Sequence, residues 1–559
     1  MTDAATTSID DIAARFWEDL LALHPTLATM YGDERYADRL EDPGPVGRAQ
    51  MLALAQRAAT DAAAVPDDGL SVEDRITRDM LGIVGNLITE EYENHYYEIG
   101  SVDQINGPQT LLAQVSQFQP ADTPERLEAW LGRLRAYGPY IDANIDILED
   151  AKRSGRTAAR IVAERTIRQL EGLLSTPISE AVIPSLSRVA SDADRERVRD
   201  VVRDVIYPAD QRYLEALSDG YLEKTREQPG LVSAPDGEAL YRYAIRRWTT
   251  LDMDPRDVHE VGLAELAAID VERVAIARDA GFGDDVAGYR ASLADDPANQ
   301  AATREELVAR CEEDILRAAE VAPKVFGRLP KATCEVRPVE PFKEKDAPFA
   351  YYYPPTIDGS RPGTYYVNTY DLPSRTYSKL ASTTFHEAIP GHHFQIALEV
   401  EHPTLNVFRR LGARMTGAAY VEGWGLYAER LADELGLYRN QGERLGMLDA
   451  QAWRASRLIV DSGMHALGWS RQQSIDWLLK TGLSNTDAVI ETDRYIAWPG
   501  QALSYMTGMR EIRRLRKELE ARDGSRFDLR RFHDELIGHG SLPLATLTRE
   551  LPRWVPPAG

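Results

Sequence analysis

Apolar residues recur at spacings of three and four through most of this 559-residue chain, and this spacing restricts the fold more than any other feature. It is typical of amphipathic helices, which bury one face and leave a charged face in solvent. From Ile9 to about Leu217 the pattern is interrupted mainly at proline and glycine, for example at Pro120, where helices commonly end. The sequence therefore predicts a mostly α protein whose first half consists of packed antiparallel helices.

The stretch between Pro323 and Ser378 has a different character. Prolines cluster there, and residues 334–339, 349–353 and 364–369 are rich in residues that favour β-strands. We predict a small antiparallel sheet in this stretch, followed by helices to the end of the chain.

These patterns divide the chain into three regions that we expect to form one continuous structural unit. They are an N-terminal helical region that covers a cleft, a β-rich segment and a C-terminal helical region with the reactive groups, at residues 1–320, 321–380 and 381–559.

Charge and composition exclude several classes of function. Lys and Arg number 65 against 89 Asp and Glu, so the net charge is −24, which disfavours binding to nucleic acid or to an anionic membrane. No run of about 18 uncharged apolar residues occurs, and the first residues are acidic where a signal peptide needs basic ones. We therefore expect a cytoplasmic protein whose two cysteines, Cys311 and Cys334, are buried thiols.

Three of the ten histidines fall within residues 386–393, and this cluster is the most informative motif. Zinc hydrolases commonly place two histidines four residues apart on one helix, with a glutamate after the first. Here Pro390 occupies that fourth position. On a regular helix His392 is about 9 Å further along the axis, so both histidines reach one ion only if Pro390 and Gly391 distort the helix. We predict His386 and His392 as ligands, with His393 as the alternative.

A third ligand is expected from a following helix, where Glu422 and Glu429 are the candidates. Glu422 lies among aromatic and small residues next to glycines that permit close helix approach, whereas Glu429 fits a solvated helix face. We therefore predict Glu422 as the ligand. Two imidazoles, a carboxylate and an open position are typical of catalytic zinc, so we expect one zinc per chain. Glu387 would then be the general base that activates water.

The negative charge of a tetrahedral intermediate requires a further stabilising group. Tyr505, His465 and Tyr495 are the candidates, and His465 lies four residues after Asp461, which could orient its imidazole. Arg457, one turn earlier on that face, is a candidate for binding a substrate carboxylate.

The chain resembles a known bacterial family, the domain of unknown function 885. The resemblance covers nearly the whole chain, and its most specific part is the histidine cluster with Glu422-Gly423-Trp424; other parts are Tyr366-Val367-Asn368 and residues 461–466 and 499–505. The family is grouped with gluzincin-type metallopeptidases, so the resemblance implies a large helical body around a deep cleft, with the small sheet next to the active-site helix. It also implies that residues 364–369 hold the substrate backbone by adding it as a strand.

The sequence as a whole predicts a zinc metallopeptidase that cleaves short peptides, with a peptide or small amide as substrate. Two alternatives remain at this stage: a metal-dependent amidase or esterase on other substrates, and a non-catalytic protein that binds peptides through its metal. The oligomeric state stays open.

Overall fold

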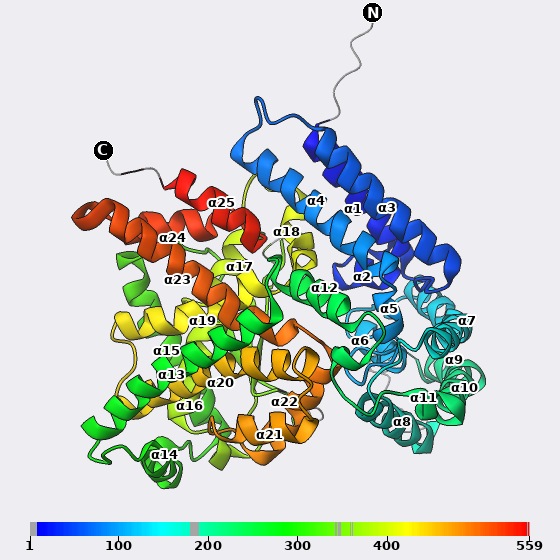
Figure 1. The fold of residues 1–559 in the computed structure, drawn as a ribbon. Helices are drawn as coiled ribbons and strands as arrows, with labels where there is room; N and C mark the ends of the chain where they lie inside the picture. The colour runs from blue at the N-terminus through cyan, green and yellow to red at the C-terminus, as the bar shows by residue number, and fades with distance from the viewer. Residues whose placement is uncertain are drawn as a thin grey trace, which may run out of the picture.

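The chain is built mainly from α-helices, as the spacing of its apolar residues predicts (Figure 1). The structure is a computed structural model, and it describes residues 8–178, 189, 191–340, 344, 348–357, 359, 361–555 and 557. Within this part of the chain, no helix is long and apolar enough to cross a membrane.

The first helices form a hairpin-like layer at one end of the molecule (Figure 1). A capping box of Ser71 and Asp74 starts α4, and Gly85 lets α3 approach closely, because a Cβ there would lie 2.6 Å from the Ala55 carbonyl oxygen. The helices of this layer are α1 (Ile9–Leu23), α2 (Pro25–Met30), α3 (Pro45–Ala64) and α4 (Val72–Glu93). The short helices α5 (Tyr96–Ile99) and α6 (Leu111–Val115) lead from it to the next group, whose core includes Val115.

A second group of helices follows and has its own hydrophobic core, which also includes residues from the last third of the chain. This group consists of α7 (Pro124–Ser154), α8 (Arg160–Ser175), α9 (Asp192–Val201), α10 (Tyr207–Ala216) and α11 (Leu222–Lys224). The chain then returns towards the centre through α12 (Gly237–Thr249), α13 (Pro255–Asp279), α14 (Val286–Asp295) and α15 (Arg304–Val321).

Three short strands form the sheet, and their pairing corrects one prediction. The strands are β1 (Cys334–Pro338), β2 (Ala350–Tyr353) and β3 (Gly363–Val367), in the order β1-β3-β2. Because β2 and β3 follow each other as a hairpin they pair antiparallel, but β1 pairs with the far side of β3 and runs parallel to it. The sheet is therefore mixed, not antiparallel as we predicted.

Ten helices complete the described chain. They are α16 (Tyr377–Glu387), α17 (His392–Val400), α18 (Val407–Leu411), α19 (Ala419–Glu434), α20 (Gln441–His465), α21 (Arg471–Leu479), α22 (Asn485–Ala497), α23 (Ser504–Asp523), α24 (Leu529–Ile537) and α25 (Leu544–Trp554). The central one, α20, is buried along most of its length and packs against α13 on one side and α16 on another.

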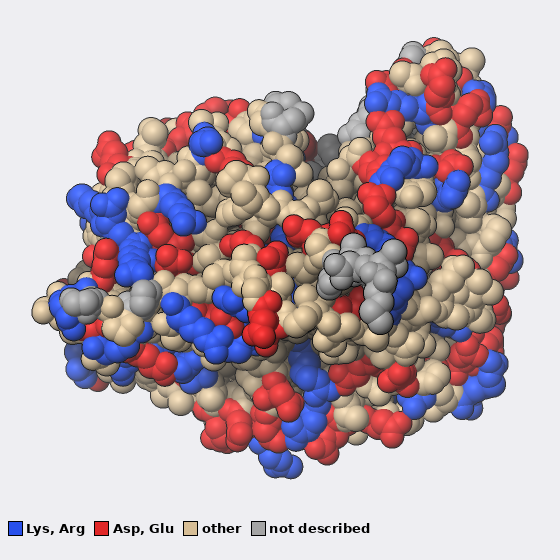
Figure 2. Space-filling view, turned by 90° about the horizontal axis from the view of Figure 1, so that it is seen from above, with Lys and Arg blue, Asp and Glu red and all other residues tan. Residues whose placement is uncertain are grey.

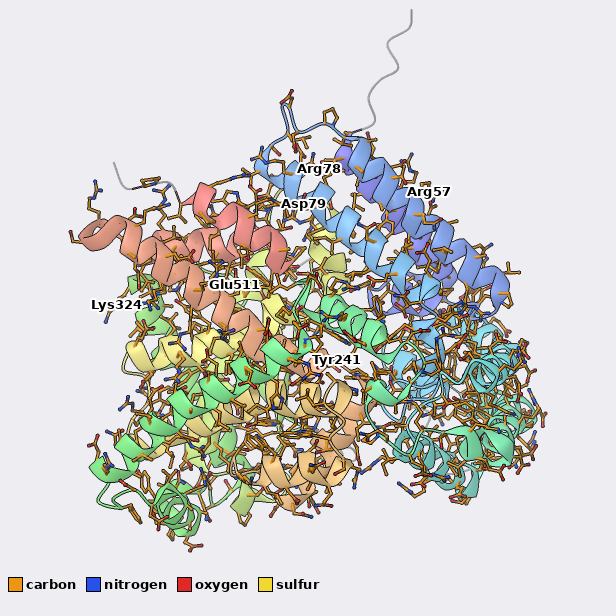
Figure 3. The ribbon with its side chains drawn as sticks, in the orientation of Figure 1. Arg57, Arg78, Asp79, Tyr241, Lys324 and Glu511 are labelled. Carbon is orange, nitrogen blue, oxygen red and sulfur yellow. The ribbon has the colours of Figure 1, made fainter. Side chains whose placement is uncertain are left out.

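The largest hydrophobic core contains residues from α1 through α25, so helices from both ends of the chain share it. Polar contacts reinforce this closure. Asp79 on α4 pairs with Arg549 on α25, and Glu511 on α23 accepts a hydrogen bond from Thr548 (Figure 3). The N-terminal layer is thus tied to the last helix.

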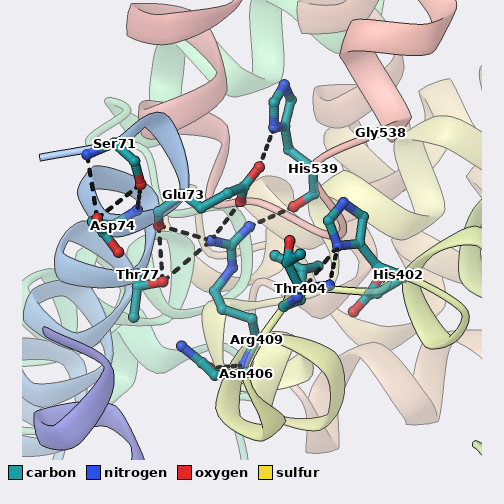
Figure 4. Close-up of polar contacts among 12 residues, drawn as sticks. Ser71, Glu73, Asp74, Thr77, His402, Thr404, Asn406, Arg409, Gly538 and His539 are labelled. Atoms are coloured by element: carbon teal, nitrogen blue, oxygen red, sulfur yellow. Dashed lines mark hydrogen bonds and ion pairs between the residues drawn. The ribbon is translucent and has the colours of Figure 1, made fainter.

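A second polar connection joins α4, α18 and the loop after α24 (Figure 4). Glu73 accepts a hydrogen bond from His539 at 2.6 Å and forms an ion pair with Arg409 at 3.2 Å. The Arg409 side chain is fully buried and also donates to the His539 carbonyl oxygen. Removing the acceptors of a buried arginine is costly, so these contacts hold the three segments in one arrangement.

Acidic and basic side chains are interspersed over the face seen in Figure 2. The excess of acidic residues is therefore spread over that face and not gathered in one patch. Cys311 and Cys334 are both free thiols, Cys311 buried and Cys334 half-buried.

Candidate metal centre

The sequence between His386 and His392 forms a sharp break between two helices. Helix α16 ends at Glu387, the Ile389–Pro390 peptide bond is cis, and α17 begins at His392. A Cβ at Gly391 would lie 1.9 Å from the His386 carbonyl oxygen, so only glycine lets the chain fold back this closely on α16. The break predicted at Pro390-Gly391 is therefore present, and it brings His392 back beside His386.

The two imidazoles face each other and share one carboxylate. Their ring centroids are 4.6 Å apart, with the ring planes almost perpendicular. Glu422 Oε2 lies 3.5 Å from His386 Nε2 and 3.5 Å from His392 Nε2. Zinc ligands about 2.0–2.2 Å from the ion in a tetrahedron are about 3.3–3.6 Å from one another. Both separations of the Glu422 oxygen from the imidazole nitrogens therefore match the spacing that one zinc ion would require.

Helix α19 supplies carboxylates to both sides of the His386 ring. Glu422 faces Nε2, and Glu429, seven residues further along the same helix face, accepts a hydrogen bond from Nδ1 at 2.8 Å. Gly425 lies between them, and a Cβ there would be 2.7 Å from Cε1 and Nε2 of the ring. The His386 imidazole therefore lies against the bare backbone of α19, between two acidic residues two turns apart.

Glu429 is fully buried, which corrects the prediction that it lies on a solvated helix face. Its carboxylate also accepts a hydrogen bond from Ser382 at 2.7 Å. A carboxylate on the far nitrogen of a metal-binding histidine fixes the tautomer and leaves the other nitrogen free to coordinate. Glu429 thus orients His386.

The electrostatics of this group suit a cation. Burial lowers the pKa of His386, but Glu422 and Glu429 outweigh it and raise the pKa to about 9. Burial raises the pKa of Glu422, and the two imidazoles more than offset this, so its pKa lies well below the usual value. Glu387 adds a third carboxylate within 4.8 Å of the ring nitrogens. Three carboxylates around two imidazoles leave a buried negative charge that a dication would offset.

The loop between α16 and α17 is held from α19 as well. The buried Trp424 indole donates to the carbonyl oxygens of Pro390 and Gly391, at 3.0 and 3.1 Å. Helix α19 thus contributes Glu422, the loop contact and Glu429 from one stretch of sequence.

His393 points away from this group. Its Nδ1 lies 3.0 Å from the Tyr352 hydroxyl and its Nε2 lies 3.1 Å from the Ala332 carbonyl oxygen, and burial lowers its pKa to about 4. Both nitrogens are therefore engaged with the sheet region, and His392 is the histidine that lies beside His386. The buried His392 Nδ1 has no hydrogen-bond partner among the described residues.

The candidates for stabilising a negative intermediate have different surroundings. His465 accepts a hydrogen bond from the Leu231 amide at Nδ1, donates to the Tyr495 carbonyl oxygen from Nε2, and has a pKa lowered by burial to about 3. Asp461 accepts instead from Tyr241 and the Gly500 amide, so the expected pair with His465 is not formed.

Tyr495 and Tyr505 both contact Arg457, whose guanidinium carbon is 5.8 and 4.3 Å from their ring centroids. The Tyr495 hydroxyl donates to Glu491 and accepts from Arg457, which engages it. The Tyr505 ring is 6.5 Å from the His386 ring and nearly parallel to it. Burial raises the pKa of Tyr505 and Glu422 raises it further, so its phenol is a hydrogen-bond donor at neutral pH. Tyr505 is thus the candidate next to the histidines.

The strand expected to hold a substrate is not available for that purpose. β3 is the central strand of the sheet and pairs with β1 on one edge and β2 on the other. A peptide can add only to a free strand edge, so the expectation for residues 364–369 is wrong, and only β1 and β2 have an outer edge.

Sequence reasoning missed the orienting role of Glu429, although it named this residue as a candidate ligand, and it missed Arg454 entirely. Glu429 was detectable from its spacing, since a residue seven positions after Glu422 shares its helix face. Arg454, on α20 next to Tyr505, has no comparable signal in the sequence, because one more arginine on a charged helix is unremarkable.

The comparison with known families agrees with the resemblance seen in the sequence. Residues 25–551 match the family described as "Bacterial protein of unknown function (DUF885)". The chain belongs to this family. No curated protein matches the chain. The family therefore supplies no established activity to this member.

Two solved structures are similar over almost their whole length. One, from Colwellia psychrerythraea, is 28% identical with a TM-score of 0.90 and covers 98% of this chain and 99% of its own. The other, from Shewanella oneidensis, is 20% identical with a TM-score of 0.76, covers 97% and 99%, and shows the fold alone. Both are described as a "putative lipoprotein", which does not support the cytoplasmic location expected for this chain.

Gly425→Ala tests the close contact between α19 and His386. The added methyl group overlaps the imidazole, so we expect the ring to shift and zinc affinity to fall by tenfold or more, measured by competition with a chelator. Gly82→Ala on α4 is the matched control, because a Cβ there meets nothing within 4 Å. That control should keep zinc affinity, and equal affinity in both variants would contradict the contact.

Glu429→Gln tests the orienting role of the buried carboxylate. The amide keeps the shape but weakens the hydrogen bond to His386 Nδ1, so zinc affinity should fall about 10- to 100-fold. Unchanged affinity, with the fold intact by circular dichroism, would show that Glu429 serves packing only.

Proposed function

We propose that this protein is a zinc-dependent hydrolase, and specifically a metallopeptidase that cleaves short peptides. The observation that carries the proposal is the equal 3.5 Å separation of Glu422 Oε2 from the Nε2 atoms of His386 and His392, with Glu387 beside them. The donor set of two imidazoles and one carboxylate fits zinc and is typical of catalytic sites that keep an open position.

The ion would be held by His386, His392 and Glu422. When bound, zinc lowers the pKa of a water molecule and polarises a carbonyl group. The chain's own residues would orient the ligands and transfer the proton. Glu429 keeps the proton of His386 on Nδ1, so that Nε2 presents its lone pair.

Glu387 is the proposed general base. It follows His386 directly at the end of α16. Its carboxylate lies within 4.8 Å of the histidine nitrogens but forms no ion pair with them. In peptide hydrolysis it would take a proton from the attacking water and pass it to the leaving amine. Tyr505 would donate a hydrogen bond to the oxygen that becomes negative.

The restriction to short peptides is part of the proposal, and burial supports it. The His386 side chain is 3% exposed and that of Glu422 is 21% exposed. A chain within a folded protein would not reach groups this buried, so the burial favours a short peptide as the substrate. We also propose that the protein is related to gluzincin peptidases. The histidine cluster and the helical surroundings support this relationship.

Location remains a prediction. Because the two structural relatives are described as putative lipoproteins, we propose a membrane-anchored or extracytoplasmic location, and fractionation of the source cells would test this. Recovery in the cytoplasmic fraction would contradict it and would agree with the prediction made from composition.

Glu387→Gln separates an enzyme from a protein that only binds peptides. The zinc-loaded protein should cleave members of a pooled peptide library, and the variant should lose about 10²- to 10⁴-fold in turnover while it keeps one zinc per chain by elemental analysis. Glu434→Gln on α19 is the control, because it removes only an ion pair with Arg516 near the surface, and it should keep full turnover.

No cleavage by the zinc-loaded wild type would contradict the peptidase. A matching panel of small amides and esters then tests the alternative hydrolase, and binding without any turnover would leave the non-catalytic alternative.

A further inference from the structure

Two arginines of α20 lie near the Tyr505 ring. Arg457 and Arg454 have their guanidinium carbons 4.3 and 6.0 Å from the ring centroid. Arg494 on α22 shares Glu491 with Arg457, and all three arginines lower the pKa of the Tyr505 phenol against the opposite effect of Glu422. Tyr505 is therefore a neighbour both of the candidate metal centre and of a basic cluster, defined here as Arg454, Arg457 and Arg494.

The basic cluster has more positive than negative charge. Glu491 is the carboxylate that pairs with Arg457 at 3.3 Å and with Arg494 at 2.7 Å. Arg454 forms no ion pair among the described residues, and its one hydrogen bond goes to the Ala450 carbonyl oxygen. Arg454 lowers the pKa of the Glu429 carboxyl without forming an ion pair with it, so its guanidinium keeps donors for an anionic ligand.

Arg457 is held rigidly and has an unused donor. Its guanidinium lies between the rings of Trp453 and Tyr505, 4.2 and 4.3 Å from their centroids, and its Nε donates to Tyr495 at 2.9 Å. The residue is 3% exposed, yet Nη1 has no hydrogen-bond partner among the described residues. A buried charged donor without an acceptor is costly, so a ligand that supplies one would bind strongly.

The distances relate the basic cluster to the candidate metal centre. The Tyr505 ring is 6.5 Å from the His386 ring and 4.3 Å from the Arg457 guanidinium, which limits the distance between these two groups to the sum of the two. An extended peptide advances at most about 3.3–3.6 Å per residue. About three residues or fewer therefore span the gap between a bond placed at the histidines and a group placed at the arginines.

We propose that the basic cluster binds the α-carboxylate at the C-terminus of the substrate, so that the enzyme removes one or a few residues from the C-terminal end of short peptides. This inference rests on the proposed peptidase function. The reaction is hydrolysis: the peptide C–N bond breaks, water supplies the oxygen of the new carboxylate, and the released fragment leaves with a free amine. Arginine suits the task because its planar fork matches the two oxygens of a carboxylate.

Binding is tested first, on zinc-loaded protein carrying Glu387→Gln so that no probe is consumed. The probes are acetylated penta-alanine as the free acid, the same peptide as its C-terminal amide, and an amide whose last residue is glutamate. By calorimetry, the free acid should bind at least tenfold more tightly than either amide. Equal binding of acid and amide, or no binding at all, would overturn the inference.

Two arginine variants assign any preference to the basic cluster. Arg454→Gln should abolish the preference for the free acid, and Arg457→Lys should weaken it by removing the fork while keeping the charge. The matched control is Arg444→Gln on the same helix, which loses an ion pair with Asp433 near the surface and should keep the preference. Tight binding of the glutamate-ended amide would place an acidic side chain, not the chain terminus, at the arginines and would overturn the inference.

Product analysis distinguishes the two proposals from each other. Wild-type protein should release fragments from the C-terminal end of the free acid and leave the amide intact, as seen by mass spectrometry. Equal cleavage of acid and amide would keep the peptidase and overturn the carboxylate site. A preference in binding with no cleavage of any peptide would keep the carboxylate site and overturn the peptidase.

Discussion

The contact on which the rest of the site depends is that of the His386 imidazole with one face of α19. Glu422 and Glu429 meet its two nitrogens, and Gly425 between them removes the side chain that would push the ring away. A histidine held at both nitrogens has one tautomer and one orientation. Glu387 is placed by its position next to His386 at the end of α16, and His392 by the sharp turn at Gly391, so the contact of α16 with α19 determines the geometry of the whole group.

The surrounding fold keeps this helix pair fixed. α20 packs against α16 and carries Arg454 and Arg457 beside Tyr505, while α23 packs against α19 and has Tyr505 as its second residue. The proposed metal ligands, general base, oxyanion donor and basic cluster thus come from α16, α17, α19, α20, α22 and α23. The helices of the first half share cores with these elements, so their stability supports the site although they contribute no side chain to it in our proposal.

Much of this was predictable from local sequence, and the remainder required tertiary information. Helical periodicity identified the fold class, and Pro390-Gly391 indicated the break that brings His392 to His386. Glu429 was misjudged because a charged residue on a helix is exposed or buried according to which helix packs there, and the partner α16 is distant in sequence. The predictions of an antiparallel sheet and of a substrate-binding strand at residues 364–369 were wrong for the same reason. The strand order, which places β3 in the centre and β1 parallel to it, is decided by the whole chain.

The most direct test of the account is anomalous diffraction at the zinc absorption edge from crystals grown with zinc. We expect one peak per chain about 2.0–2.2 Å from His386 Nε2, His392 Nε2 and a Glu422 carboxylate oxygen. A peak elsewhere, or no peak in crystals of protein that binds zinc in solution, would contradict the claim that these three residues form the metal centre.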